Sequence, residues 1–144
     1  MSILLSENKM KLDIASLVLD SKAVTFDYPD MKGFSVDLNY VSKTKMNDLR
    51  KSCMITKYDT KLGIPVQNLD NELWIPAFCK EVIKGWKGLT LGYLAQLLLI
   101  DEAGLDLTEE VEYSVENAVT LLTKSTAFDN WVNSCLTDIS NFRK

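Results

Sequence analysis

The 144-residue sequence contains no histidine, and this absence excludes several kinds of catalytic and metal site. Histidine is the usual general base beside a serine or cysteine nucleophile, so no Ser–His or Cys–His pair can be built. The three cysteines, Cys53, Cys79 and Cys135, are far apart and lack the spacing of zinc ligands. This pattern is typical of reduced thiols that pack as small apolar side chains. We therefore expect no metal site.

Phosphate-binding and calcium-binding motifs are also missing. The segment Gly85-Trp86-Lys87-Gly88 is too short for a glycine-rich phosphate loop and does not match its spacing. Glu109, Glu110 and Glu112 do not have the spacing of an EF-hand, and acids between helices are usually solvated. The sequence thus predicts no catalytic residue, no cofactor-binding residue and no cofactor, and we expect a protein that is not an enzyme.

Strong positive charge is absent as well. The formal net charge is −4 and the isoelectric point is about 4.8, whereas a nucleic-acid binder needs a basic face. Two interpretations fit the local group of basic residues, a small nucleic-acid patch or a solvated helix face, and we favour the second. The group comprises Lys43, Lys45, Arg50, Lys51 and Lys57.

Long apolar runs are missing from the chain. The N-terminal residues 1–13 contain no signal-peptide apolar region, and the run Leu94–Ile100 is too short to cross a bilayer. The lack of long apolar runs leads us to expect no membrane among the partners. The acidic net charge leads us to expect no nucleic acid.

What is present begins with a pattern typical of β-strands. Apolar and polar residues alternate across Val24–Tyr28 and again across Phe34–Tyr40, which predicts two half-buried strands. Between them, Pro29–Gly33 has the proline and glycine of a tight connection, so the two strands should form a hairpin. A lone hairpin is marginal, so another element must cover its apolar face.

Helical spacing follows the hairpin. A helix is expected at about Thr44–Lys57, and Lys61–Pro65 then breaks the pattern, as a hinge between two parts would. A second helix is predicted over about Pro76–Trp86. Thr90 should cap a third, which Gly104 ends, and the acidic segment Leu105–Val111 should be a loop. Residues 1–20 fit either a short strand or a helical turn.

The C-terminal segment predicts two capped helices. Ser114 is a good N-cap with Glu116 in the first turn, and Ser125 can cap a second helix after a tight turn. The second helix has an apolar stripe at three- and four-residue spacing, formed by Phe128, Trp131, Val132, Cys135, Ile139 and Phe142. The predicted class is α+β, with a β-containing part at residues 1–62 and a helical part at residues 63–144.

Several motifs in the C-terminal half resemble the signature of the tailed-bacteriophage tail assembly chaperones. In order along the chain they are Val82–Trp86, Tyr113-Ser114, Glu116-Asn117-Ala118, Leu121-Leu122, Phe128-x-x-Trp131-Val132 and Asp138-x-x-Asn141-Phe142. The sequence departs from that signature in its long acidic linker after Ile100 and in Pro76. The N-terminal hairpin is not covered by the resemblance.

This resemblance implies a non-catalytic protein of the host bacterial cytoplasm. It would coat the tape measure protein, keep it soluble and help to recruit the tail tube protein, whose subunits then replace it. The protein would be absent from the mature virion. Other functions that we considered are a tail-completion or other structural protein retained in the virion, and a small host-directed inhibitor or adaptor.

Aromatic residues are the candidates for contact with a partner. Trp74, Phe78 and Tyr93 are the ones that we expect to face it. Trp86, Phe128 and Trp131 are further candidates, although aromatic residues at helical spacing more often pack in a core. The same apolar surface makes self-association of the free chain an additional expectation.

Overall fold

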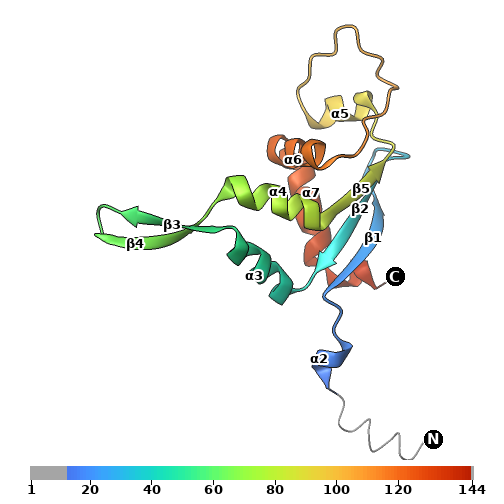
Figure 1. Cartoon of the computed structure of the whole chain (residues 1–144). Helices are drawn as coiled ribbons and strands as arrows, with labels where there is room; N and C mark the ends of the chain where they lie inside the picture. Colours follow the sequence, from blue (N-terminus) through green and yellow to red (C-terminus); the bar gives the residue numbers. More distant parts are fainter. Residues whose placement is uncertain (1–12, 144) are drawn as a thin grey trace, which may run out of the picture.

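A computed structural model describes residues 13–143 of the chain (Figure 1). The first element is a single helical turn, α2 (Ile14–Leu17), which Asp13 caps by accepting a hydrogen bond from the Ala15 N–H. Of the two conformations predicted for the N-terminal segment, the structure shows the helical turn. The rest of that segment, residues 1–12, lies outside the described residues.

A three-stranded antiparallel sheet forms the centre of the molecule. Its strands are β1 (Ser21–Asp27), β2 (Ser35–Val41) and β5 (Ile83–Lys87), in the order β1-β2-β5. The first two form the predicted hairpin, and the Tyr28 N–H donates to the Phe34 carbonyl across its turn at 2.9 Å. Since β2 has a neighbour on each side, it is the central strand.

The third strand corrects the predicted helix Pro76–Trp86. Helix α4 (Asn71–Val82) begins after the N-cap Asp70 and ends sooner than expected, and the chain then continues as β5. Ile83 pairs with Leu38 and Trp86 pairs with Val36 on β2. Because Ile83 and Trp86 are three residues apart, their spacing also fits a helix face, so periodicity alone could not reveal the strand.

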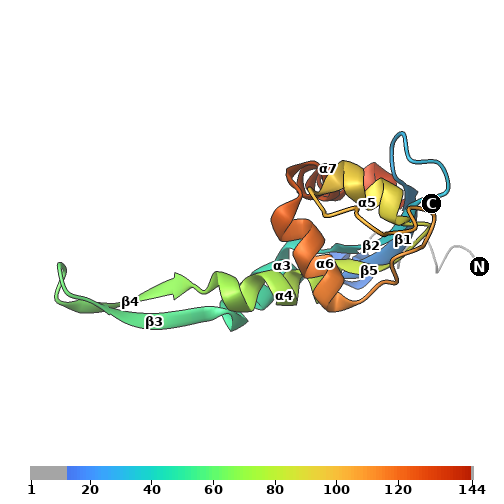
Figure 2. The same ribbon diagram turned by 90° about the horizontal axis from the view of Figure 1, so that it is seen from above.

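The helix predicted at Thr44–Lys57 is also shorter than expected. Helix α3 (Lys43–Ser52) is followed by a second hairpin, β3 (Met54–Asp59) and β4 (Ile64–Leu69). The predicted hinge at Lys61–Pro65 is therefore wrong, because these residues form the tip of a hairpin and the start of its second strand. Gly63 has a φ of 69°, a left-handed conformation that a hairpin turn requires. This hairpin, which we call the arm (residues 54–69), projects from the body (Figures 1 and 2).

The C-terminal helices confirm the predicted caps. Thr90 caps α5 (Leu91–Leu97), Ser114 caps α6 (Val115–Lys124), and Ser125 caps α7 (Thr126–Thr137). The predicted end of the first of these helices at Gly104 is wrong, because Leu98 is already extended. Each side-chain oxygen accepts a hydrogen bond from an N–H in the first turn of its helix, which satisfies a donor that would otherwise have no partner. The short 3₁₀ helix η1 (Ile139–Phe142) ends the described chain.

The core lies between the sheet and these helices. Val36 and Leu38 of β2 are fully buried, and Phe128 and Val132 of α7 are buried against the same cluster. Burial alternates from Ser35 to Leu38, as the period of two predicted, but this alternation ends there, because Asn39 and Val41 are both buried. Strands from residues 1–62 and the strand β5 from residues 63–144 share one sheet and one core. The chain is α+β, as the sequence predicted.

Close packing at one glycine gives a test of this arrangement. Gly88 has a φ of 77°, and a Cβ built on it would lie 1.9 Å from the Gly33 carbonyl oxygen. Gly104 has a φ of 75° but nothing within 4 Å. We expect Gly88→Ala to lower the free energy of unfolding by roughly 3 kcal/mol, from backbone strain and overpacking together. Gly104→Ala should cost only about 1 kcal/mol, from strain alone. Equal losses in urea unfolding would contradict the packing of these two turns.

Two aromatic residues of α7 should differ in their contribution to stability. Phe128 is fully buried, whereas Trp131 is half-buried at the edge of the core, with its ring centroid 4.6 Å from that of Tyr28. Phe128→Ala should therefore lower the free energy of unfolding by about 3–5 kcal/mol, and Trp131→Ala by less. The opposite order in chemical denaturation would place Trp131, not Phe128, at the centre of the core.

Candidate functional site

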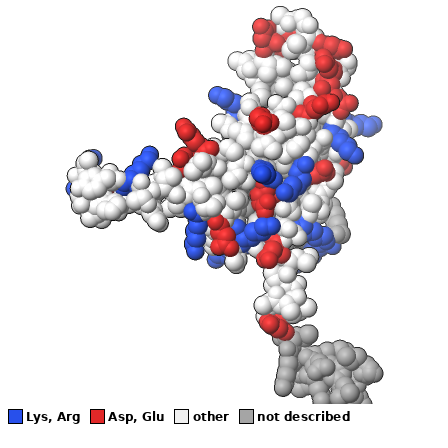
Figure 3. All heavy atoms as spheres, in the orientation of Figure 1, with Lys and Arg blue, Asp and Glu red and all other residues white. Residues whose placement is uncertain are grey.

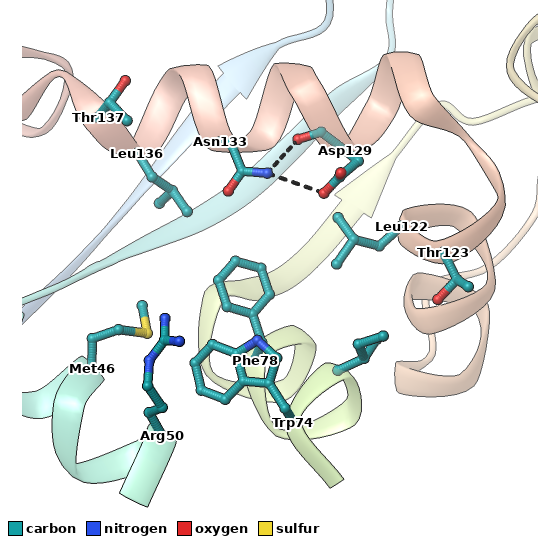
Figure 4. Close-up of a pocket in the computed structure, with 11 residues that line it drawn as sticks. Met46, Arg50, Trp74, Phe78, Leu122, Thr123, Asp129, Asn133, Leu136 and Thr137 are labelled. Carbon is teal, nitrogen blue, oxygen red and sulfur yellow. Dashed lines mark hydrogen bonds between the residues drawn. The ribbon is translucent and has the colours of Figure 1, made fainter. Parts of the chain in front are cut away.

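A groove of about 570 Å³ runs between the pair α3 and α4 and the pair α6 and α7 (Figure 4). It is open to solvent along its length and is the candidate site of the protein. Four helices contribute its lining residues, which are Met46, Arg50, Trp74, Ile75, Phe78, Leu122, Thr123, Asp129, Asn133, Leu136 and Thr137.

One wall of the groove is built by α3 and α4. Trp74 and Phe78 are four residues apart on α4, so they lie on one face of the helix, with ring centroids 5.7 Å apart. The Arg50 guanidinium lies over the Trp74 ring, 5.1 Å from its centroid. A cation above an aromatic face is attracted by the ring quadrupole, so Arg50 restrains the indole. Met46 extends this wall beside Arg50 (Figure 4).

The opposite wall is contributed by α6 and α7. Leu122 and Leu136 are half-buried and supply apolar surface, while Asp129 and Asn133 add polar groups along α7. The Asn133 amide donates to the Asp129 carbonyl at 2.9 Å and to its carboxylate at 3.0 Å. An apolar interior is therefore flanked by a cation, Arg50, on one wall and by an anion, Asp129, on the other.

An ion pair on the surface ties α3 to α4. The Lys45 ammonium lies 2.9 Å from the Glu81 carboxylate, and that of Lys84 lies 3.8 Å away. The hydrogen bond from Lys45 is the largest cause of the lowered pKa of Glu81, whose charged form is favoured. Such partly exposed pairs contribute little stability, roughly 0–1 kcal/mol. Only the pair of Lys45 with Glu81 joins α3 to α4.

One cysteine lies directly behind the first wall of the groove. Cys79 lies on α4 next to Phe78, but its side chain is fully buried. Burial, with a smaller effect from the Asp129 carboxylate, raises the pKa of this thiol to about 11. The reactive form of cysteine is the thiolate, so Cys79 is held as an inert thiol at neutral pH. Residues 13–143 contain no cluster of three or more side chains that could hold a metal ion.

The structure brings together two of the six predicted contact residues. Trp74 and Phe78 share the groove, both half-buried with surface that a partner can reach. Tyr93 lies elsewhere, where its hydroxyl donates to the Lys32 carbonyl at 2.6 Å and fastens α5 to the turn of the first hairpin. Its ring stacks on Phe34 at 6.5 Å.

The other three predicted residues have structural contacts. Phe128 and Trp86 are buried in the core, and the Trp86 indole N–H donates to the Val111 carbonyl at 2.9 Å. Trp131 packs on Tyr28 and forms a T-shaped pair with Phe26. These contacts within the chain explain why aromatic residues stand at these positions, with no need for a partner. Packing in the core is the interpretation that helical spacing favoured.

Sequence reasoning missed the polar residues of the groove. Arg50 belonged to the basic group on α3, and nothing local indicated that its guanidinium would cover Trp74. Asp129 and Asn133 are four residues apart and adjacent to the apolar stripe of α7, which placed them beside a helix packing face. That spacing was the available signal, but which helix they would face depended on tertiary packing.

Comparison with known proteins gives one match. The family model for the YdaY prophage protein matches residues 39–144. The chain belongs to this family. The match begins within β2 and covers every element of the groove and the arm, so the candidate site lies wholly within the YdaY region. No curated protein and no solved structure matches the chain significantly. The family links the chain to bacteriophages, in agreement with the phage origin that the resemblance to tail assembly chaperones implied.

No helix among residues 13–143 has the length and apolar character needed to cross a membrane.

The buried thiol behind the groove gives a pH-dependent test. The pKa of Cys79 rises from 9.0 to about 11 on folding, so between these values the unfolded chain loses a proton that the folded chain keeps. Stability therefore falls as pH rises through this window, by roughly 2 kcal/mol from this group. Urea unfolding should show a steeper decline for the native sequence than for Cys79→Ala, which lacks this thiol. Parallel curves would show that the thiol is not held in a buried site.

Proposed function

We propose that this YdaY-family protein is a phage tail assembly chaperone, which binds the tape measure protein through the groove between its helices. The observation that carries the proposal is the pair Trp74 and Phe78, held side by side in an open groove whose lining is partly apolar and partly polar. The resemblance of the C-terminal half to tail assembly chaperones supports it, as does membership of a prophage family.

The groove suits an amphipathic helix as its ligand. Such a helix presents apolar side chains at i, i+3, i+4 and i+7, which would fill the space between Trp74, Phe78 and Leu122. Its polar flanks would meet Arg50 on one side and Asp129 on the other, so the groove can accept a helix with charges of both signs. Tape measure proteins are long and largely helical, and one such chain offers many similar sites.

Weak binding at each site is an advantage in this role. Many copies along one long ligand give high avidity although each contact is weak. Each copy can then be displaced singly when tail tube subunits arrive. We further propose that the protein has no catalytic activity, acts in the host cytoplasm and is absent from the mature virion.

Co-expression with the tape measure protein of the same phage tests the proposal. We expect the native chain to keep that protein in the soluble fraction and to co-purify with it. The double variant Trp74→Ala/Phe78→Ala should reduce the recovered complex by about tenfold or more, because it removes two aromatic anchors. Leu17→Ala is the matched control, since Leu17 is an exposed apolar residue on α2 outside the groove. Circular dichroism must show that each variant is folded.

Two results would contradict the proposal. One is a tape measure protein that is equally soluble with and without this chain and yields no complex. The other is the detection of the chain as a regular component of purified virions, which would favour a structural or tail-completion protein. A complex that survives the groove variant but not the control would move the binding site away from the groove.

A further inference from the structure

The arm has exposed apolar side chains that no other element covers. Tyr58 is 67 % exposed, Leu62 at its tip is 64 % exposed and Ile64 is 52 % exposed. Within residues 13–143, β3 and β4 pair only with each other (Figure 1). An isolated two-stranded ribbon is marginally stable in water and becomes stable when something covers a face.

Both faces of the arm are partly apolar. Tyr58 lies opposite Pro65 on one face, and Val66 lies opposite Lys57 on the other. Pro65 lacks an N–H and interrupts the donors of β4, whereas β3 contains no proline and leaves an edge that can accept a further strand. Lys57 and Lys61 give the arm a net charge of +1, since Asp59 is its one acid.

A second uncovered surface lies in the loop between α5 and α6. This acidic loop (residues 98–112) contains six acidic residues and no lysine or arginine. Exposed leucines are interspersed among the acids. Leu99 is fully exposed, Leu105 is 43 % exposed and Leu107 is 40 % exposed. Figure 3 shows the acids gathered on this projection, at a distance from the arm.

The base of the acidic loop is fixed to the body. The N–H groups of Leu91 and Gly92 donate to the Glu109 and Leu107 carbonyls at 2.8 and 2.9 Å. The Glu110 carboxylate accepts a hydrogen bond from the Gly88 N–H at 3.0 Å. The leucines and acids of this loop are therefore presented from a defined framework.

We propose that the arm of one copy docks on the acidic loop of a second copy of this chain. The two surfaces are complementary in hydrophobicity and in charge. Apolar side chains and lysines of the arm would meet apolar side chains and carboxylates of the loop. In Figure 1 the arm and the acidic loop project in different directions from the body, and in Figure 2 the arm extends away from the part of the body that carries the loop, so the arm of a copy does not cover its own loop. The partner is a second molecule.

This contact is head-to-tail. Each copy would use its arm toward one neighbour and its acidic loop toward another, and such a heterologous interface builds rings or open filaments. The groove is lined by residues that belong to neither the arm nor the acidic loop. The inference does not depend on the chaperone function, although a self-assembling coat would suit a long ligand.

Charge reversal with rescue tests the proposal. Sedimentation velocity of the full-length chain alone should show concentration-dependent association that weakens with added salt. The arm variant Lys57→Glu/Lys61→Glu and the loop variant Glu102→Lys/Glu109→Lys should each associate about tenfold or more weakly than the native chain, because attraction becomes repulsion. Mixed in equal amounts, the two variants should associate with each other, since opposite charges are restored at one contact.

The control is Lys32→Glu/Lys124→Glu, which makes the same change of charge as the arm variant at exposed positions outside the arm and the loop. It should associate like the native chain, and circular dichroism should show that all variants are folded. Three outcomes would overturn the proposal. They are a native chain that stays monomeric, association that both reversals leave unchanged, and a mixture that shows no recovery. Loss of tape measure binding by the groove variant tests the proposed function separately, because that variant keeps the arm and the loop.

Discussion

The pairing of β2 with β5 is the contact on which the rest of the structure depends. It joins residues about fifty positions apart, with Val36 opposite Trp86 and Leu38 opposite Ile83. Because α4 ends directly at β5, this pairing also fixes where α4 lies. The Asn39 side chain reinforces it by donating to the Glu81 carbonyl at 3.0 Å. The position of the groove is therefore set by the sheet.

Helix α4 serves two surfaces at once. Cys79 and Val82 are buried in the core, while Trp74 and Phe78 line the groove. The core residues hold the helix in place, so the two aromatic side chains are presented on a rigid element. Rigid presentation lowers the entropy lost on binding. A site of this kind needs no loop to close over its ligand.

More apolar surface is present than the core can bury. The groove, the arm and the acidic loop each expose it, and each is built from different residues. Exposed apolar patches of this kind mark interaction sites. Abundant negative charge in the acidic loop helps to keep a chain with such surfaces in solution. These surfaces are the ones that the two proposed contacts would use.

The sequence by itself determined those elements that depend only on residues close together in the chain. The hairpin of β1 and β2 follows from period-two alternation, and the caps at Ser114 and Ser125 follow from hydroxyls that satisfy the first N–H groups of a helix. Tertiary structure decided the rest. Ile83–Trp86 became a strand because β2 offered an unpaired edge, and Arg50 reached Trp74 because the sheet placed α3 beside α4. Neither choice is encoded in a residue's near neighbours, since hydrogen bonds between strands and contacts between helices join positions that only folding brings together.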